Sequence, residues 1–87
     1  MKVRIPDPLR SYTAREKVVE AAGSTVAEVF ADLDRRFPGL RFRVIDEQGR
    51  LRRHMNVFVN ADAVRDLGTA VGPDDEVTIM QALSGGA

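Results

Sequence analysis

One amphipathic segment constrains the fold of this chain more than any other feature of its sequence. Five apolar residues recur through it at the spacing of one helical face: Val26, Val29, Phe30, Leu33 and Phe37. Thr25 and Glu28 have the spacing of a capping box, in which two side chains satisfy free backbone amides at a helix start. Pro38 and Gly39 are expected to end the helix. A helix with a single apolar face needs a second layer to cover it.

Four other segments alternate apolar and polar residues with the period of two that is typical of half-buried strands. They span residues 2–5, 16–22, 55–60 and 76–82. Val3 with Ile5, and Val19 with Ala21, mark the buried faces of the first two segments. Because little chain separates these two segments, we expect them to pair as a hairpin.

The remaining segments are expected to connect these elements. Residues 6–11 are predicted as a loop, residues 60–66 as a polar turn and residues 72–75 as a β-turn. Residues 40–54 show no clear period. Six apolar residues in and after this irregular stretch are expected to pack: Phe42, Val44, Ile45, Leu67, Ala70 and Val71. The order of elements predicts an α+β domain with one helix laid across a small sheet.

The composition excludes several kinds of functional site. The 87 residues include no cysteine and a single histidine, His54, which rules out disulfides, thiolate metal sites and histidine clusters. Thirteen Lys and Arg balance thirteen Asp and Glu, so no bulk attraction to nucleic acid or to an acidic membrane is expected. No segment has the ~20 apolar residues that span a bilayer, and the start lacks the pattern of a signal peptide. We therefore expect a single domain that works in the cytoplasm.

Phe58 and Met80 are the candidates for a binding surface on the sheet. If Val57 faces the helix, the alternation points Phe58 to the other face. The same reasoning from Ile79 places Met80 on that other face. Two neighbouring large apolar side chains on a small domain indicate a docking surface, although single exposed hydrophobic residues are common. An ordinary solvated face is the alternative.

Two clusters of charged residues each allow a functional and a plainer interpretation. The basic cluster consists of Arg41, Arg43, Arg50, Arg52, Arg53 and His54. Since the net charge is zero and no aromatic residue is interleaved for base stacking, we interpret this cluster as a solvated loop. Contact with an acidic protein partner is the alternative. Asp74, Asp75 and Glu76 are interpreted as turn residues rather than metal ligands, because turns favour aspartate.

The last five residues, Leu83-Ser84-Gly85-Gly86-Ala87, are predicted to form a flexible tail after a domain that spans residues 1–82. Glycine has no Cβ, so an extended Gly-Gly segment fits a channel too narrow for other residues. Such an end also presents a carboxylate that another enzyme can reach. The alternative is an ordinary frayed chain end.

Four motifs in this order resemble the ThiS/MoaD-type ubiquitin-like sulfur carriers. They are Gly-Ser-Thr-Val-Ala-Glu-Val at the helix start, Met-Asn-Val-Phe-Val-Asn, Asp-Asp-Glu-Val-Thr-Ile-Met and the Gly-Gly near the end. The resemblance covers essentially the whole chain and implies a β-grasp fold, with one main helix packed on one face of a small mixed sheet. Within the family, the Val-Phe-Val-Asn strand and the longer middle look most like the CysO-like branch, which carries sulfide for cysteine synthesis.

The resemblance implies a co-substrate rather than an enzyme. In this family an E1-like adenylating enzyme uses ATP to activate the terminal glycine carboxylate, here that of Gly86, and a sulfur donor then converts it to a thiocarboxylate. A sulfur-acceptor synthase, such as a cysteine-synthase-like enzyme, would be the second partner. This chain itself would bind no cofactor and no metal. The expected partner-binding residues are Phe58, Met80, Leu83, Ser84 and Gly85.

Ala87 departs from the family pattern, because members that act directly end in Gly-Gly. Short extensions in some relatives are trimmed by a JAMM-type zinc protease, so we expect Ala87 to be removed, with an expression remnant as the plainer explanation. Trimming favours a carrier for cysteine or a specialised metabolite. Three alternatives stay open: a small subunit of molybdopterin synthase, a ubiquitin-like modifier joined to lysines, and a β-grasp interaction module that transfers no sulfur.

Overall fold

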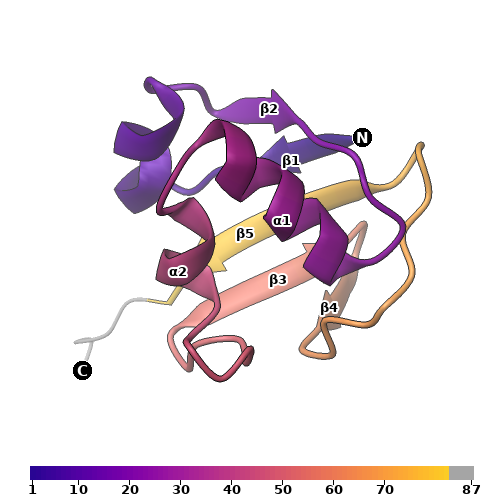
Figure 1. Cartoon of the computed structure of the whole chain (residues 1–87). Helices are drawn as coiled ribbons and strands as arrows, with labels where there is room; N and C mark the ends of the chain where they lie inside the picture. Colours follow the sequence, from indigo (N-terminus) through magenta and orange to yellow (C-terminus); the bar gives the residue numbers. More distant parts are fainter. Residues whose placement is uncertain (83–87) are drawn as a thin grey trace.

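The computed structural model describes residues 1–82, which form one layer of strands and one layer of helices (Figure 1). The sheet contains β1 (Lys2–Arg4), β2 (Val18–Glu20), β3 (Met55–Val59), β4 (Asp62–Val64) and β5 (Glu76–Gln81). Its strand order is β2-β1-β5-β3-β4. Helices α1 (Val26–Arg36) and α2 (Leu40–Val44) lie on one face of this sheet. The expected α+β arrangement, a mixed sheet with one main helix on one face, is confirmed.

The centre of the sheet joins its first and last strands. β1 pairs in parallel with β5, and Val3 lies opposite Val77. The other pairs are antiparallel, including the expected hairpin of β1 and β2, in which Val3 lies opposite Val19. β3 flanks β5 on the other side, with Val57 opposite Ile79. This register places these valines and Ile79 on the same face of the sheet, beneath the helices.

Helix α1 begins and ends where the sequence predicts. The Thr25 hydroxyl accepts a hydrogen bond from the Glu28 amide at 3.2 Å. The Glu28 carboxylate accepts from the Ser24 amide at 2.8 Å, so the reciprocal bond reaches one residue further back than in an ideal capping box. The helix ends at Arg36, ahead of Pro38. Its apolar face is fully buried through Val26, Val29, Phe30 and Leu33.

The core lies between α1, α2 and the inner face of the sheet. The largest side chains in it are Phe30, Ile5, Leu9, Leu33, Leu40, Ile45, Met55 and Ile79. Each fully buried side chain of this kind contributes about 1.5–3 kcal/mol relative to an exposed one. These side chains all come from residues 1–82, where the helix layer and the sheet pack on each other.

Two segments predicted without regular structure contain short elements. The predicted loop at residues 6–11 is a 3₁₀ helix, Asp7–Thr13, because proline fixes φ at a value that suits a first helical turn, and Leu9 is buried beneath it. The predicted turn at residues 60–66 includes β4, which pairs with β3 through Phe58 opposite Ala63. β4 is a polar edge strand of three residues, which gives periodicity little to detect.

The irregular middle also differs from expectation. Leu40 and Val44 are buried on one side of α2, and Phe42, which was expected to pack, is 52% exposed. Helical spacing explains this, because residue i+2 points away from the face that residues i and i+4 share. Ala70 is exposed as well, since it alternates with the buried Val71 in extended chain.

Candidate functional site

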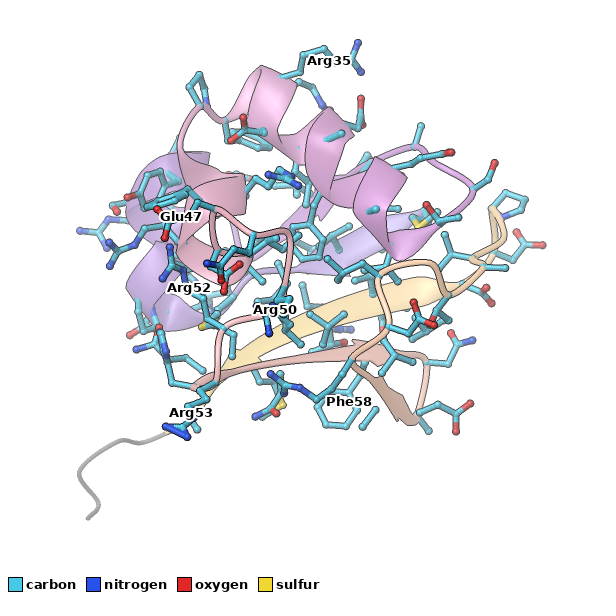
Figure 2. The ribbon with its side chains drawn as sticks, turned by 60° about the horizontal axis from the view of Figure 1, so that its bottom comes forward. Arg35, Glu47, Arg50, Arg52, Arg53 and Phe58 are labelled. Atoms are coloured by element: carbon cyan, nitrogen blue, oxygen red, sulfur yellow. The ribbon has the colours of Figure 1, made fainter. Side chains whose placement is uncertain are left out.

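The face of the sheet that the helices leave open carries the predicted apolar pair. Phe58 is half-buried and Met80 is 50% exposed, while their neighbours Val57 and Ile79 are buried. Figure 2 shows Phe58 on the opposite side of the sheet from the helices. The predicted orientation of both side chains is therefore confirmed. Their docking role stays a prediction.

Register places Phe58 and Met80 on neighbouring strands. Phe58 lies opposite Thr78 of β5, and Met80 lies opposite Asn56 of β3, so the two apolar side chains are diagonal neighbours on one face. Towards β1 the same face becomes charged, because Arg4 lies opposite Thr78 and pairs with Glu76 at 3.0 Å. The apolar surface is thus confined to the part of the face formed by β3, β4 and the end of β5.

The described chain ends one residue after β5, beside the basic cluster. The Ala82 amide donates to the His54 carbonyl at 2.7 Å. The predicted tail residues Leu83, Ser84, Gly85, Gly86 and Ala87 lie outside the described residues. Since Leu83 is bonded to Ala82, the predicted tail starts next to His54 and three residues after Met80.

The basic cluster contains an aromatic residue that the sequence prediction missed. The Arg52 guanidinium lies over the Phe42 ring, 4.5 Å from its centroid, and Arg52 Nε donates to the Phe42 carbonyl at 2.8 Å. The Arg65 guanidinium also fixes this loop, because it donates to the carbonyls of Leu51, Arg52 and Met55. The statement that no aromatic is interleaved with these arginines is therefore wrong. Phe42 and Arg52 are ten residues apart in sequence, and the pairing required the α2 fold.

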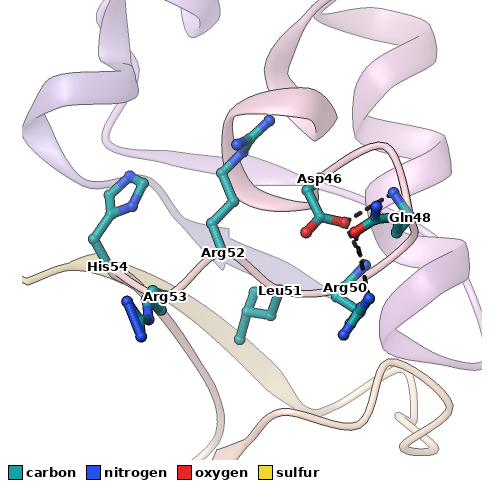
Figure 3. A pocket seen from close by; sticks show the side chains of 7 residues that line it. All are labelled: Asp46, Gln48, Arg50, Leu51, Arg52, Arg53 and His54. Atoms are coloured by element: carbon teal, nitrogen blue, oxygen red, sulfur yellow. Dashed lines mark hydrogen bonds between the residues drawn. The ribbon is translucent and has the colours of Figure 1, made fainter.

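Asp46 lies in the same loop as Arg50 and Arg52 (Figure 3). Its Oδ1 accepts from the amides of Gln48 at 2.9 Å and Arg50 at 3.0 Å. The Arg50 amide, followed by the Gln48 amide and the nearby Arg50 and Arg52 guanidinium groups, lowers the pKa of Asp46 below its usual value despite some desolvation. Asp46 is thus an ionised turn residue that fixes the loop backbone.

The acidic turn before β5 is structural, as predicted. Asp75 accepts from the Asn60 side chain at 2.9 Å and from the Gly72 amide at 2.8 Å, and these two bonds lower the pKa of Asp75. Glu76 is paired with Arg4. Within residues 1–82 no three acidic or histidine side chains gather as metal ligands. No helix in that range is both long enough and apolar enough to cross a bilayer.

A β-grasp sheet whose last strand leads within a few residues to Gly-Gly defines a ubiquitin-like protein. The ThiS family pattern matches residues 3–86 of this chain. The sulfur carrier protein CysO of Mycobacterium tuberculosis is 39% identical over 89 residues, which cover 97% of this chain and 96% of that protein. The chain therefore belongs to the ThiS family, and the resemblance expected from the motifs is confirmed.

Two solved structures place the chain more finely. A chain of the Amycolatopsis orientalis BexX/CysO complex is 40% identical and superposes with a TM-score of 0.91, covering 97% of both chains. The small archaeal modifier protein SAMP1 of Haloferax volcanii is 30% identical with a TM-score of 0.76, covering 98% of this chain and 97% of that one. Both confirm the β-grasp fold, and the CysO chain agrees with the CysO-like branch.

Proposed function

We propose that this protein carries sulfur as a thiocarboxylate on Gly86 and donates it in the biosynthesis of cysteine or a specialised metabolite. The observation that carries the proposal is the 39% identity to CysO over nearly the whole chain. The match to the family pattern also ends at Gly86, the residue to which the chemistry is assigned. The protein acts as a co-substrate in the cytoplasm, and ATP is used by the partner enzyme.

The chemistry requires two displacements. A Gly86 carboxylate oxygen attacks the α-phosphorus of ATP, and pyrophosphate leaves. The resulting acyl adenylate has a good leaving group, so hydrosulfide attacks its carbonyl carbon, AMP departs and a proton is released. The product is a thiocarboxylate whose sulfur is nucleophilic at neutral pH. A sulfur-acceptor synthase, such as a cysteine-synthase-like enzyme, then takes up the sulfur.

The adenylating enzyme is proposed to bind two regions of this protein. Phe58 and Met80 supply an apolar surface on the open face of the sheet. Leu83, Ser84 and Gly85 connect that surface to the reactive end and would enter the enzyme's channel. The crystal structure of a BexX/CysO complex shows that a relative of this chain forms a complex with another protein.

Ala87 is proposed to block activation until it is removed. A channel that admits only Gly-Gly would have no room for the Ala87 methyl group, and Ala87 moves the terminal carboxylate one residue beyond Gly86. A JAMM-type zinc protease is the expected trimming enzyme. The chain that ends at Gly86 is then the active form.

Intact mass spectrometry tests this proposal directly. Chains ending at Ala87 and at Gly86 are each incubated with the cognate adenylating enzyme, ATP and a sulfide source. The Gly86 chain should gain the mass of one oxygen-to-sulfur exchange, and Gly86→Ala in that chain should abolish the gain. Equal conversion of the Ala87 chain would contradict the need for trimming, and no conversion of either chain would contradict the carrier function.

A role as a protein modifier is the second candidate. The 30% identity to a small archaeal modifier protein favours it, because that relative shares the fold over almost the whole chain. A modifier leaves an isopeptide remnant on the lysines of target proteins, whereas a sulfur carrier does not. Proteomic detection of such remnants that depend on Gly86 would favour the modifier.

A further inference from the structure

The basic cluster has no role in the function proposed above, although it concentrates the positive charge of the protein. Residues 41–54 hold five of the thirteen Lys and Arg residues and two of the thirteen Asp and Glu residues. The remainder of the chain is therefore net negative, because the total is zero. Among the described residues, no arginine of the cluster forms an ion pair with a carboxylate.

The neighbouring carboxylate does not neutralise these arginines by direct contact. Asp46 directs one oxygen to two backbone amides of its own turn. Arg50 donates to the neutral side chain of Gln48, and Arg53 is exposed. Figure 3 shows the residues that line a surface hollow of about 410 Å³ at this place: Asp46, Gln48, Arg50, Leu51, Arg52, Arg53 and His54. Asp46 and Gln48 also line the hollow, but no arginine there forms an ion pair with a carboxylate of the described residues.

The cluster is also held in place, unlike an ordinary solvated loop. Arg52 is fixed by its hydrogen bond and its stacking on Phe42. The amide of Arg52 donates to the Val44 carbonyl at 2.9 Å, which ties the loop to α2. Arg65 donates to the Leu51 and Arg52 carbonyls from the other side. A surface that is already ordered loses little conformational entropy when a partner binds.

The basic cluster lies at the end of β5, next to the point where the chain continues towards Gly86. β5 starts after the acidic turn of Asp74 and Asp75 and runs for roughly 20 Å, by the rise of a strand, to Ala82 and His54. The protein is therefore electrically polar along β5, with its positive end where residues 83–87 begin. A partner that receives these residues must approach the positive end.

We propose that the basic cluster is a second contact surface for the adenylating enzyme, and that it binds an acidic surface beside the channel that receives residues 83–86. This inference rests on the proposed function. Opposite charges around the channel would orient the protein with its Gly-Gly end forward and accelerate the encounter. A protein surface is favoured over RNA because the Arg52 guanidinium already stacks on the one aromatic ring in the cluster, where a base would have to stack, and the whole chain has no net charge.

Charge reversal with a matched control tests the inference. Arg50→Glu and Arg53→Glu each change an exposed arginine of the cluster. Arg35→Glu makes the same charge change on α1, at the opposite end of Figure 2 from Arg53, and also removes the ion pair of Arg35 with Asp32. Binding of each full-length chain ending at Gly86 to the adenylating enzyme is measured by surface plasmon resonance at 50 and 500 mM salt. Each cluster variant should bind roughly tenfold more weakly at low salt, mainly through a slower association rate. The control should stay within about twofold.

Other outcomes separate this inference from the function on which it rests. If all three variants bind the enzyme as tightly as the unmodified chain, and that chain is thiocarboxylated, the proposed contact surface is wrong. The carrier function then stands. If the unmodified chain neither binds nor is thiocarboxylated, both are wrong. If the cluster variants instead lose binding to a fluorescent single-stranded RNA and keep their affinity for the enzyme, the cluster is an RNA site. Circular dichroism melting of each variant shows whether it is folded.

Discussion

Asn60 and Asp75 lock the two turns at one end of the sheet together. The Asn60 side-chain amide donates to Asp75 Oδ1 at 2.9 Å, and the Asn60 side-chain oxygen accepts from the Glu76 amide at 2.9 Å. The Asn60 backbone amide donates in turn to the Glu76 carbonyl at 2.7 Å. Asn60 has a positive φ of 54°, a conformation that asparagine tolerates better than most residues. One residue thus joins the end of β3 to the start of β5.

Asn60→Gly tests the contribution of these side-chain bonds. Glycine adopts the positive φ without strain, so the loss of stability reports the missing amide group together with the larger backbone entropy that glycine gives the unfolded chain. We expect the melting temperature to fall by roughly 8–16 °C, because each of the two bonds contributes about 1 kcal/mol and 1 kcal/mol shifts the melting temperature by about 4–8 °C in a domain of this size. The measurement is thermal denaturation followed by circular dichroism. An unchanged melting temperature would mean that water replaces the Asn60 side chain without loss.

Aspartate substitutions on the two faces of the sheet, in β3 and β5, test which side chains face the core. Val57→Asp places an unpaired carboxylate in the core and should unfold the domain. Phe58→Asp and Met80→Asp should leave the domain folded and weaken binding to the adenylating enzyme, because both side chains reach solvent. Circular dichroism and a binding assay read the two effects separately. Loss of the fold in Phe58→Asp to the same degree as in Val57→Asp would contradict the assignment.

Gly23 is required by the close approach of α1. A Cβ at this position would lie 2.7 Å from the Val29 amide nitrogen and 2.9 Å from the Glu28 Cβ. Gly23→Ala should therefore displace the helix start and destabilise the domain by about 1–3 kcal/mol. Gly72→Ala is the control, because its Cβ would meet nothing closer than 3.7 Å, and we expect a change within about 0.5 kcal/mol. Urea denaturation measures the free energy of unfolding of both variants. Equal losses in Gly23→Ala and Gly72→Ala would contradict the requirement for glycine at position 23.

The acid sensitivity of the fold should depend on Asp32. The Ala22 amide, which donates to Asp32 at 2.9 Å, is the main cause that lowers its pKa below 3.8, with Arg35 and Arg36 adding to the effect against desolvation. Because the folded pKa lies below the unfolded value, the stabilisation is complete above the unfolded pKa. It is lost as the pH falls through the folded pKa.

Asp32→Asn retains an oxygen for the Ala22 amide and removes the charge. The variant should be less stable at pH 7, and its stability should depend less on pH below about 4. Urea denaturation between pH 7 and pH 2 measures how the free energy of unfolding changes with pH in the variant and in the unmodified chain. Asp46 and Asp75 also have lowered pKa values, so the variant should keep part of the acid sensitivity. Parallel stability curves for the variant and the unmodified chain would show that Asp32 does not contribute.

The sequence predicted the elements whose residues carry a period or a cap. The stripe from Val26 to Leu33 and the alternation around Val57 specified α1, β3 and the outward direction of Phe58. The pattern failed where packing between distant segments decides the structure. α2 has five residues and is stabilised by burial of Leu40 and Val44, and the position of Phe42 over Arg52 follows from that burial. The spacing of residues within each segment does not show that arginines of different segments lie on the same surface of the folded protein.

The parallel pairing of β1 with β5 determines when the domain can fold during its synthesis on the ribosome. The two strands that complete the middle of the sheet are the first and the last to be synthesised. Until β5 has emerged, β1 has no partner on one side, and α1 has no finished surface to cover. Contacts of such long range form slowly and late. The domain therefore folds after β5 is available. A truncated chain without β5 leaves apolar residues of the core exposed, and we expect cellular proteases to degrade it.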